Sequence, residues 1–195
     1  MAVGAGVRTV SSVTAPHGPE IVADAATTVA AALGHSWERP NDPYADSPFA
    51  PLRACSSRTK GAKFEELAEW HLREHGHEVI RADASDYDRR VDGRRVEIKG
   101  SFLWSPGDMF RWQQIRLDQD YDLIVFLALY PDRVEYYACT KEEAALALRT
   151  PDASGKLVHN QHGGHDVDSG TFFIDGLPEE IEWFHPLDDF FPDGE

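Results

Sequence analysis

Residues 87–101 read YDRRVDGRRVEIKGS, and this stretch decides the fold. Asp92-Gly93 in its middle is a dipeptide that favours a two-residue hairpin turn, so a short strand is expected on each side. Glu97 and Lys99 are two residues apart, and they therefore project from the same face of the second strand. The hairpin places a carboxylate and an ammonium side by side, with the Asp88 carboxylate one strand away.

Two carboxylates and a lysine so close together are costly in a bare fold, but they suit a hard cation next to a phosphate. Mg²⁺ prefers a few carboxylate oxygens together with water and substrate phosphate oxygens. Asp88 and Glu97 are the expected ligands, and Lys99 would orient or deprotonate a water, or neutralise charge that develops on the phosphate. The alternative is a surface hairpin whose acids are solvated and balanced by Arg90 or Arg95.

At these residues the chain resembles the PD-(D/E)xK nuclease superfamily, which includes many restriction endonucleases. Asp88 matches the first acid of that family, Glu97 its second acid and Lys99 its lysine. The resemblance covers roughly residues 58 to 148. The leading proline of the family motif is absent, which leaves Asp86 as a rival to Asp88.

Two further segments are similar to parts of that family's core. Residues 61–68 resemble its first helix, which often carries a glutamate facing the metal, and Glu65 fits that position better than Glu66. Either glutamate could equally be a solvated helix charge. The segment with Gln113 and Gln114 resembles a glutamine-bearing helix that follows the acid-x-lysine strand. These glutamines would contact the metal shell or the DNA backbone, or form a plain polar helix face.

The resemblance implies Mg²⁺-dependent hydrolysis of phosphodiester bonds in double-stranded DNA, of restriction or defence type, with Mn²⁺ able to substitute. The implied catalytic set is Asp88, Glu97, Lys99, Glu65 and Gln114, and the Ile98 carbonyl would help to hold the metal. A homodimer that cuts both strands is expected from the resemblance alone. The alternatives are a nuclease of the same fold acting on RNA, branched DNA or single strands, and an inactive nuclease-like scaffold for a protein partner.

The apolar periodicity predicts an α/β fold, with a central mixed sheet flanked by helices in the order α-β-β-β-α-β. The resemblance implies that this core is restriction-endonuclease-like. A continuous apolar run after residue 122 predicts a strand buried on both faces. The expected elements are a helix over 59–75, strands at Val79–Ile80, Asp88–Val91 and Arg94–Ser101, a helix over Met109–Leu117, two strands between Tyr121 and Tyr137, a helix from the capping residue Thr140 to Leu148, a strand at Thr171–Ile174 and a short helix at Pro178–Trp183.

The chain divides into an N-terminal extension, residues 1–57, and a nuclease-like domain with an acidic C-terminal region, residues 58–195. Residues 1–18 lack periodicity and are expected to be disordered. Pro19–Leu33 has apolar residues at helical spacing. The proline-rich residues 35–57 predict a loop whose aromatic side chains pack on the domain.

The sequence contains no run of eighteen apolar residues and no basic-then-apolar N-terminus, so neither a membrane span nor a secretory signal is expected. Cys55 and Cys139 lie far apart and belong to no CxxC motif. A disulfide framework is therefore not expected, and a reducing cytoplasm is the predicted location.

The formal net charge of −15 is the main objection to a nucleic-acid enzyme. Residues 56–118, which hold the candidate site, carry 12 basic and 12 acidic side chains. Residues 119–195 carry 4 basic and 17 acidic side chains, so the negative charge belongs mainly to the C-terminal third. This acidic region could bind a protein partner. Its aromatic end could mimic DNA or dock a partner, and a solvated tail is the favoured interpretation.

His159, His162 and His165 recur every three residues in a polar, glycine-rich segment. Imidazoles at this spacing could bind a transition metal, but they match no closed zinc motif, and a flexible polar loop is the favoured interpretation. Asn160 and Gln161 in the same segment could read adenine edges in DNA.

Overall fold

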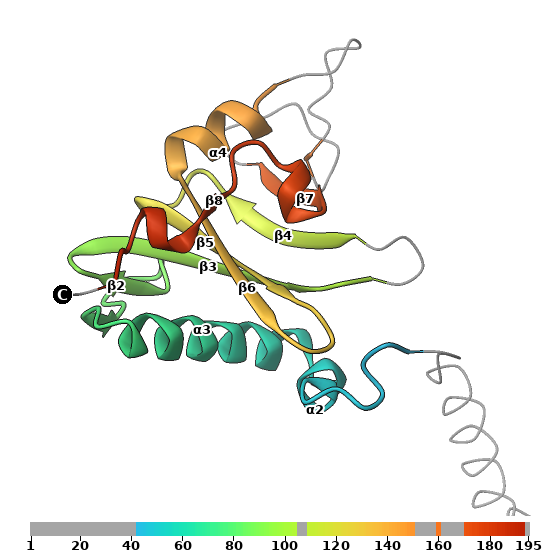
Figure 1. Ribbon diagram of the computed structural model, residues 1–195. Coiled ribbons are helices and arrows are strands. Elements are labelled where there is room, and N and C mark those ends of the chain that lie inside the picture. Colours follow the sequence, from blue (N-terminus) through green and yellow to red (C-terminus); the bar gives the residue numbers. More distant parts are fainter. Residues whose placement is uncertain (1–41, 105–108, 151–158, 161–169, 194–195) are drawn as a thin grey trace, which may run out of the picture. The chain divides into compact units, whose positions relative to one another are not determined.

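The computed structural model describes residues 42–104, 109–150, 159–160 and 170–193. In this part, helices flank a six-stranded mixed sheet, which confirms the predicted α/β fold class (Figure 1). The helices are α2 (Ala50–Ala54), α3 (Ser57–Glu74) and α4 (Lys141–Leu148), with 3₁₀-helices η1 (Pro178–Glu180) and η2 (Leu187–Asp189). The strands are β1 (Val79–Arg81), β2 (Arg89–Val91), β3 (Arg94–Phe102), β4 (Phe110–Arg116), β5 (Leu123–Leu129), β6 (Val134–Thr140), β7 (Thr171–Gly176) and β8 (His185–Pro186).

The six-stranded sheet has the order β1-β2-β3-β5-β6-β8, and its parallel pair is β3 with β5. The other neighbouring strands are antiparallel. Asp92 and Gly93 have φ angles of 47° and 84°, so both adopt the left-handed conformation that a two-residue hairpin turn requires. The predicted β2–β3 hairpin is therefore confirmed.

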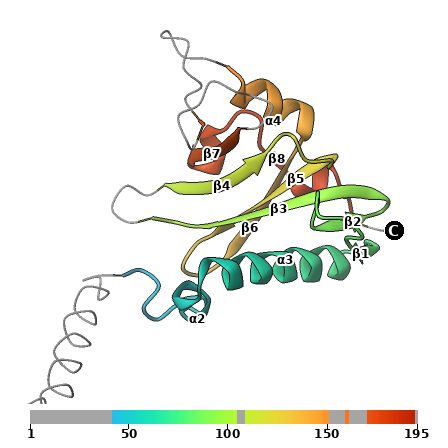
Figure 2. The ribbon, with the colours of Figure 1, turned by 180° about the vertical axis from the view of Figure 1, so that it is seen from behind.

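Both faces of this sheet are covered, as Figure 2 shows from behind. On one face α3 contributes Phe64, Ala68 and Leu72 to a core with the side chains of β3 and β5 that point toward it. The other face carries α4 and a separate two-stranded sheet formed by β4 and β7. Every residue of β5 is buried because this strand lies between the two layers, as its continuous apolar run predicts.

The helix expected over Met109–Leu117 is wrong, because this segment forms β4 and pairs with β7. Its buried residues Phe110, Trp112 and Ile115 follow intervals of two and three, since a β-bulge interrupts the alternation after Trp112. Apolar residues at mixed intervals of two and three resemble helical spacing when the sequence is considered alone. The pairing partner, β7, lies about sixty residues further along the chain, so no local sequence pattern predicted this pairing.

Residues 42–57 pack on the domain, as their aromatic residues predicted. Tyr44 is 1% exposed, and its hydroxyl donates to the Leu129 carbonyl at 2.5 Å and accepts from the Leu103 amide at 2.9 Å. These bonds tie the segment to the ends of β3 and β5. The compact unit accordingly extends from Asp42 to Glu195.

The acidic aromatic end of the chain also packs on the domain instead of being solvated. Leu187 and Phe191 are 2% and 3% exposed. The His77 ring bridges the Phe191 carbonyl, at 3.1 Å, and the Asp92 carboxylate, at 2.8 Å. The short helix expected over Pro178–Trp183 is limited to the 3₁₀-turn η1.

No helix among the described residues is long and apolar enough to cross a membrane. Cys55 and Cys139 are both free. The predictions for residues 1–18 and for Pro19–Leu33 fall outside the described residues, as do those for His162 and His165.

Candidate active site

Asp88 lies immediately before β2, at the point where the pairing of β2 with β3 ends. Its amide donates to the Val96 carbonyl at 3.0 Å, and its Oδ2 accepts from the Ile98 amide at 2.8 Å. The Asp88 side chain thereby continues the β2–β3 ladder beyond Arg89, the first residue of β2. The Asp88 carboxylate is thus held beside Glu97 at an open edge of β3, and it does not extend into solvent.

Glu97 and Lys99 point from β3 toward the layer formed by β4, β7 and α4. Their partners on β5, Ile124 and Phe126, belong to the core of that layer. Glu97 is only 6% exposed, and Lys99 Nζ donates to its Oε1 at 2.5 Å. The predicted same-face placement of the acid and the lysine is present, with both groups largely withdrawn from solvent.

The two acids interact strongly. Burial, followed by the adjacent charge of Glu97, raises the pKa of Asp88 to about 6, while the Ile98 amide and Lys99 act in the opposite direction. Like charges at close range disfavour double ionisation unless a cation compensates them. The site therefore holds negative charge that one lysine only partly neutralises.

Glu65 reaches the same region from α3. Burial, and then the charge of Asp88, raises the pKa of Glu65, whereas Arg89 lowers it. Arg89 donates to Glu65 at 2.9 Å, to Glu69 at 2.8 Å and to the Asp88 carbonyl at 2.7 Å. Glu65 is therefore near Asp88, but its carboxylate is bound by arginine.

Arg89 and Tyr121 are two site residues that the sequence did not single out. Arg89 is 7% exposed and links α3 to the strand that follows Asp88. Tyr121 is 2% exposed, and its hydroxyl is buried without a hydrogen-bond partner in the described part of the chain. Burial and then Glu97 raise the pKa of this phenol above its ordinary range. Arg89 could have been predicted as a buried site residue because it lies on the same face of β2 as the buried Val91. For Tyr121 the only signal in the sequence is its position just before β5.

The donor set fits a hard cation. Asp88 and Glu97 supply carboxylate oxygens, and the Ile98 carbonyl faces the same edge as the Ile98 amide because both groups of one strand residue point to one side. The described residues contain no group of three or more His, Cys, Asp or Glu side chains that could hold a metal ion. Mg²⁺ commonly takes one or two protein carboxylates and completes its shell with water and substrate phosphate, so two carboxylates are compatible with it.

The other candidates are placed differently. Asp86 is partly buried and contributes charge near Arg116, whereas Asp88 is the acid coupled to Glu97. Gln114 lies on the exposed face of β4, and the described residues show no hydrogen bond from it to Asp88 or Glu97. The helix-borne glutamine that the resemblance implied is therefore absent from this position.

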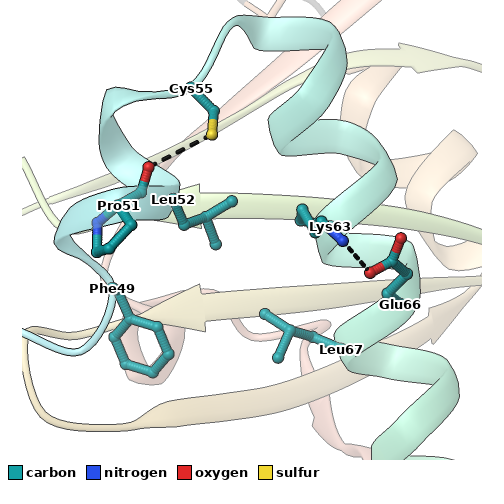
Figure 3. Close-up of a pocket in the computed structure, with 7 residues that line it drawn as sticks. All are labelled: Phe49, Pro51, Leu52, Cys55, Lys63, Glu66 and Leu67. Atoms are coloured by element: carbon teal, nitrogen blue, oxygen red, sulfur yellow. Dashed lines mark hydrogen bonds and ion pairs between the residues drawn. The ribbon is translucent and has the colours of Figure 1, made fainter.

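The hollow between α2 and α3 is separate from the carboxylates. It has a volume of about 460 Å³ (Figure 3). Its walls are mostly apolar, and the Lys63–Glu66 ion pair lies at its side. Its lining residues are Phe49, Pro51, Leu52, Cys55, Lys63, Glu66 and Leu67. Neither Asp88, Glu97 nor Lys99 lines this pocket.

No protein-family model matches the chain, and no curated protein matches it either. Among solved structures, a bacterial homing endonuclease is similar to part of the fold. The two have a TM-score of 0.36 and 19% sequence identity, over 45% of this chain and 67% of the endonuclease chain. A likeness of this size carries no conclusion about activity, which has to be argued from the side chains.

Proposed function

We propose that this chain hydrolyses phosphodiester bonds in DNA with a divalent cation, Mg²⁺ or Mn²⁺, bound by Asp88 and Glu97. The observation that carries the proposal is the adjacent acid pair. Glu97 is buried with Lys99 against it on one strand face, and burial together with the charge of Glu97 raises the pKa of the half-buried Asp88 to about 6. Two adjacent carboxylates withdrawn from solvent destabilise the charged form of the site, and groups perturbed in this way are concentrated at functional sites. The resemblance of the motif to PD-(D/E)xK nucleases supports the same assignment.

Asp88, Glu97 and Lys99 have separate roles in this proposal. Asp88 is fixed by the Ile98 amide, and Glu97 is positioned by its own strand and by Lys99. A cation bound there would polarise the scissile phosphate and lower the pKa of a bound water. Lys99 would orient that water and neutralise the charge developing on the phosphate. The water oxygen forms a bond to phosphorus as the bond to the leaving oxygen breaks, which yields a phosphomonoester and a hydroxyl.

The finer assignments rest on the resemblance. Double-stranded DNA is the proposed substrate, and restriction or defence is the proposed setting, in the cytoplasm. A homodimer would allow both strands to be cut. Size-exclusion chromatography with light scattering measures the oligomeric state directly, and a monomer that still makes double-strand breaks would contradict the dimer.

A panel of nucleic acids tests the class of substrate. Wild-type protein is incubated with modified and unmodified duplex DNA, single-stranded DNA, branched DNA and RNA, with Mg²⁺ or Mn²⁺ and with EDTA. Cleavage of duplex DNA that EDTA and Lys99→Ala both abolish is the expected result. Cleavage confined to RNA, single strands or branched DNA would overturn the duplex assignment while keeping the nuclease fold assignment.

A protein-binding scaffold is the second candidate, because residues 119–195 carry 4 basic and 17 acidic side chains. The intact set of Asp88, Glu97 and Lys99 argues against it, since a decayed site needs none of these groups. No cleavage of any member of the panel by folded protein would favour the scaffold.

A further inference from the structure

The outward face of β4 is polar along its whole length. Its inward residues Phe110, Trp112 and Ile115 are fully buried against the central sheet. Its outward residues are all exposed, and they are Arg111, Gln113, Gln114 and Arg116. The antiparallel ribbon of β4 and β7 (Figure 1) therefore has one face anchored in the core, and on its other face the described side chains of β4 are exposed.

A bulge presents both glutamines on that outward face. Trp112 pairs with Ile174 and Ile115 with Phe172, so two residues of β4 stand opposite one residue of β7. Gln114 adopts the left-handed conformation, with φ 59°, which a residue with a side chain adopts only at a cost in energy. Backbone strain of this kind is often found where a side chain has a function.

Arginines flank the two glutamines. Arg111 makes a two-pronged ion pair with Asp175, at 2.6 Å for each bond, and lies 5.2 Å from the Phe173 ring centre. Arg116 pairs with Asp118 at 2.7 Å. Glu97 is among the acids that raise the pKa of Arg116, after Asp118 and Asp86, so this end of the ribbon adjoins the candidate active site.

We propose that the outward face of the β4–β7 ribbon lies in a groove of duplex DNA, where Gln113 and Gln114 contact base edges; the inference rests on the proposed nuclease function. A two-stranded ribbon fits the major groove, and a glutamine amide can pair with adenine through two hydrogen bonds. Arg111 and Arg116 would contact the phosphates on either side. The strand between them spans roughly 16 Å, or about five base pairs. The β4 side of this face has no large apolar anchor of the kind a protein partner would need, and Phe173 on β7 is partly buried beside Arg111.

The test uses Lys99→Ala protein, which retains the ribbon, and a pool of duplexes with a randomised centre. Repeated selection should enrich a sequence, and anisotropy then measures its affinity. Gln113→Ala should weaken binding by about tenfold and relax selection at one position. Gln114→Gly should weaken binding similarly while the free energy of unfolding stays equal or rises, because glycine suits a positive φ. Arg58→Ala, on the exposed surface of α3, is the matched control and should leave binding unchanged.

The outcomes separate the two proposals. Unchanged affinity and selected sequence in both glutamine variants would overturn the ribbon assignment, even where the wild-type protein cleaves DNA. Binding that depends on the glutamines, together with no cleavage of any substrate, would support the ribbon and overturn the nuclease. No duplex binding by folded Lys99→Ala protein at low salt would also overturn the ribbon assignment.

Discussion

Asp88 shows how one residue serves both the fold and the candidate site. Its carboxylate accepts from the Ile98 amide, which caps the open edge of β3, and it lies against the charge of Glu97. The hydrogen bond holds the group in place, while the repulsion destabilises the charged form. Stability at this position therefore depends on pH and on any cation that shields the pair.

Asp88→Asn should make the metal-free protein more stable at pH 8 and hardly change it near pH 4. The folded pKa of Asp88, about 6, lies above its ordinary value of 3.8, so the penalty is absent below the lower value, grows as the pH rises from the lower value to the higher one, and is complete above it. The expected gain at pH 8 is about 3 kcal/mol, because the folded and ordinary pKa values differ by just over two units, each unit corresponds to about 1.4 kcal/mol, and the asparagine oxygen still accepts from Ile98. Urea unfolding in EDTA at both pH values measures it, with the exposed Asp132→Asn as control. A wild-type protein more stable than the variant at pH 8 would refute this explanation.

Arg89→Met should destabilise the protein by about 3 kcal/mol, because it leaves Glu65 and Glu69 without their buried cation. Its neighbour Arg90 is a matched control, since its side chain is 42% exposed and makes a looser ion pair, at 3.7 Å. Arg90→Met should cost less than about 1 kcal/mol. Equal losses in the two variants, measured by urea unfolding at pH 7, would contradict the assigned role of Arg89.

At the scale of elements, α3 packs on β3 where Gly100 leaves room for the Phe64 ring. A Cβ added at Gly100 would approach this ring to 2.2 Å, a distance that real contacts do not reach. Phe64 is itself 7% exposed and belongs to the core under the sheet. The contact sets how closely the helix lies on the strand that carries Glu97 and Lys99.

Gly100→Ala should therefore destabilise the protein by about 2 kcal/mol or more, because the ring must move within a packed core. Gly61→Ala is the control, since a Cβ there meets nothing within 4 Å and alanine favours a helix. The double variant with Phe64→Leu should recover part of the loss, which thermal unfolding can measure. A Gly100→Ala protein as stable as the wild type would show that α3 is not held at this contact.

Elements fixed by local chemistry were predictable, and elements fixed by distant partners were not. The Asp92-Gly93 turn and the Thr140 capping box require only neighbouring residues, and both are present. β4 could not be predicted because a bulge interrupts its alternation of buried and exposed residues, and because its pairing partner β7 lies far along the chain. The same reason applies within the site. Glu97 and Lys99 share a strand, so their proximity could be predicted, whereas the burial of Arg89 depends on α3.

At the scale of the whole molecule, the net negative charge is the main constraint on binding and cleaving nucleic acid. The net charge is −15, yet basic residues equal acidic ones in number over residues 56–118. The β4 side of the proposed DNA-binding face and the acid pair both lie in that balanced segment, whereas β7 lies in the acidic C-terminal third. The net negative charge of the protein repels DNA, and few side chains are available to contact phosphates. Binding of duplex DNA should therefore be weak and should depend strongly on salt.

Duplex binding by Lys99→Ala protein should fall about tenfold or more between roughly 50 and 200 mM salt, as released counterions require. Anisotropy titrations at several salt concentrations give the slope. Arg116→Ala should make that slope shallower, whereas Arg58→Ala should not change it. A slope near zero would mean that phosphate contacts contribute nothing, and it would count against the DNA-binding face.

The most direct measurement of the central claim is plasmid cleavage as a function of Mg²⁺ concentration for the wild type, Asp88→Asn, Glu97→Gln and Lys99→Ala, with Arg58→Ala as control. The site predicts metal-dependent fragments from the wild type and the control. It also predicts a loss of about a hundredfold or more in each of the three site variants, with their folds intact by circular dichroism. Cleavage that persists in EDTA, or that survives in Asp88→Asn and Glu97→Gln, would contradict a catalytic role for this carboxylate pair.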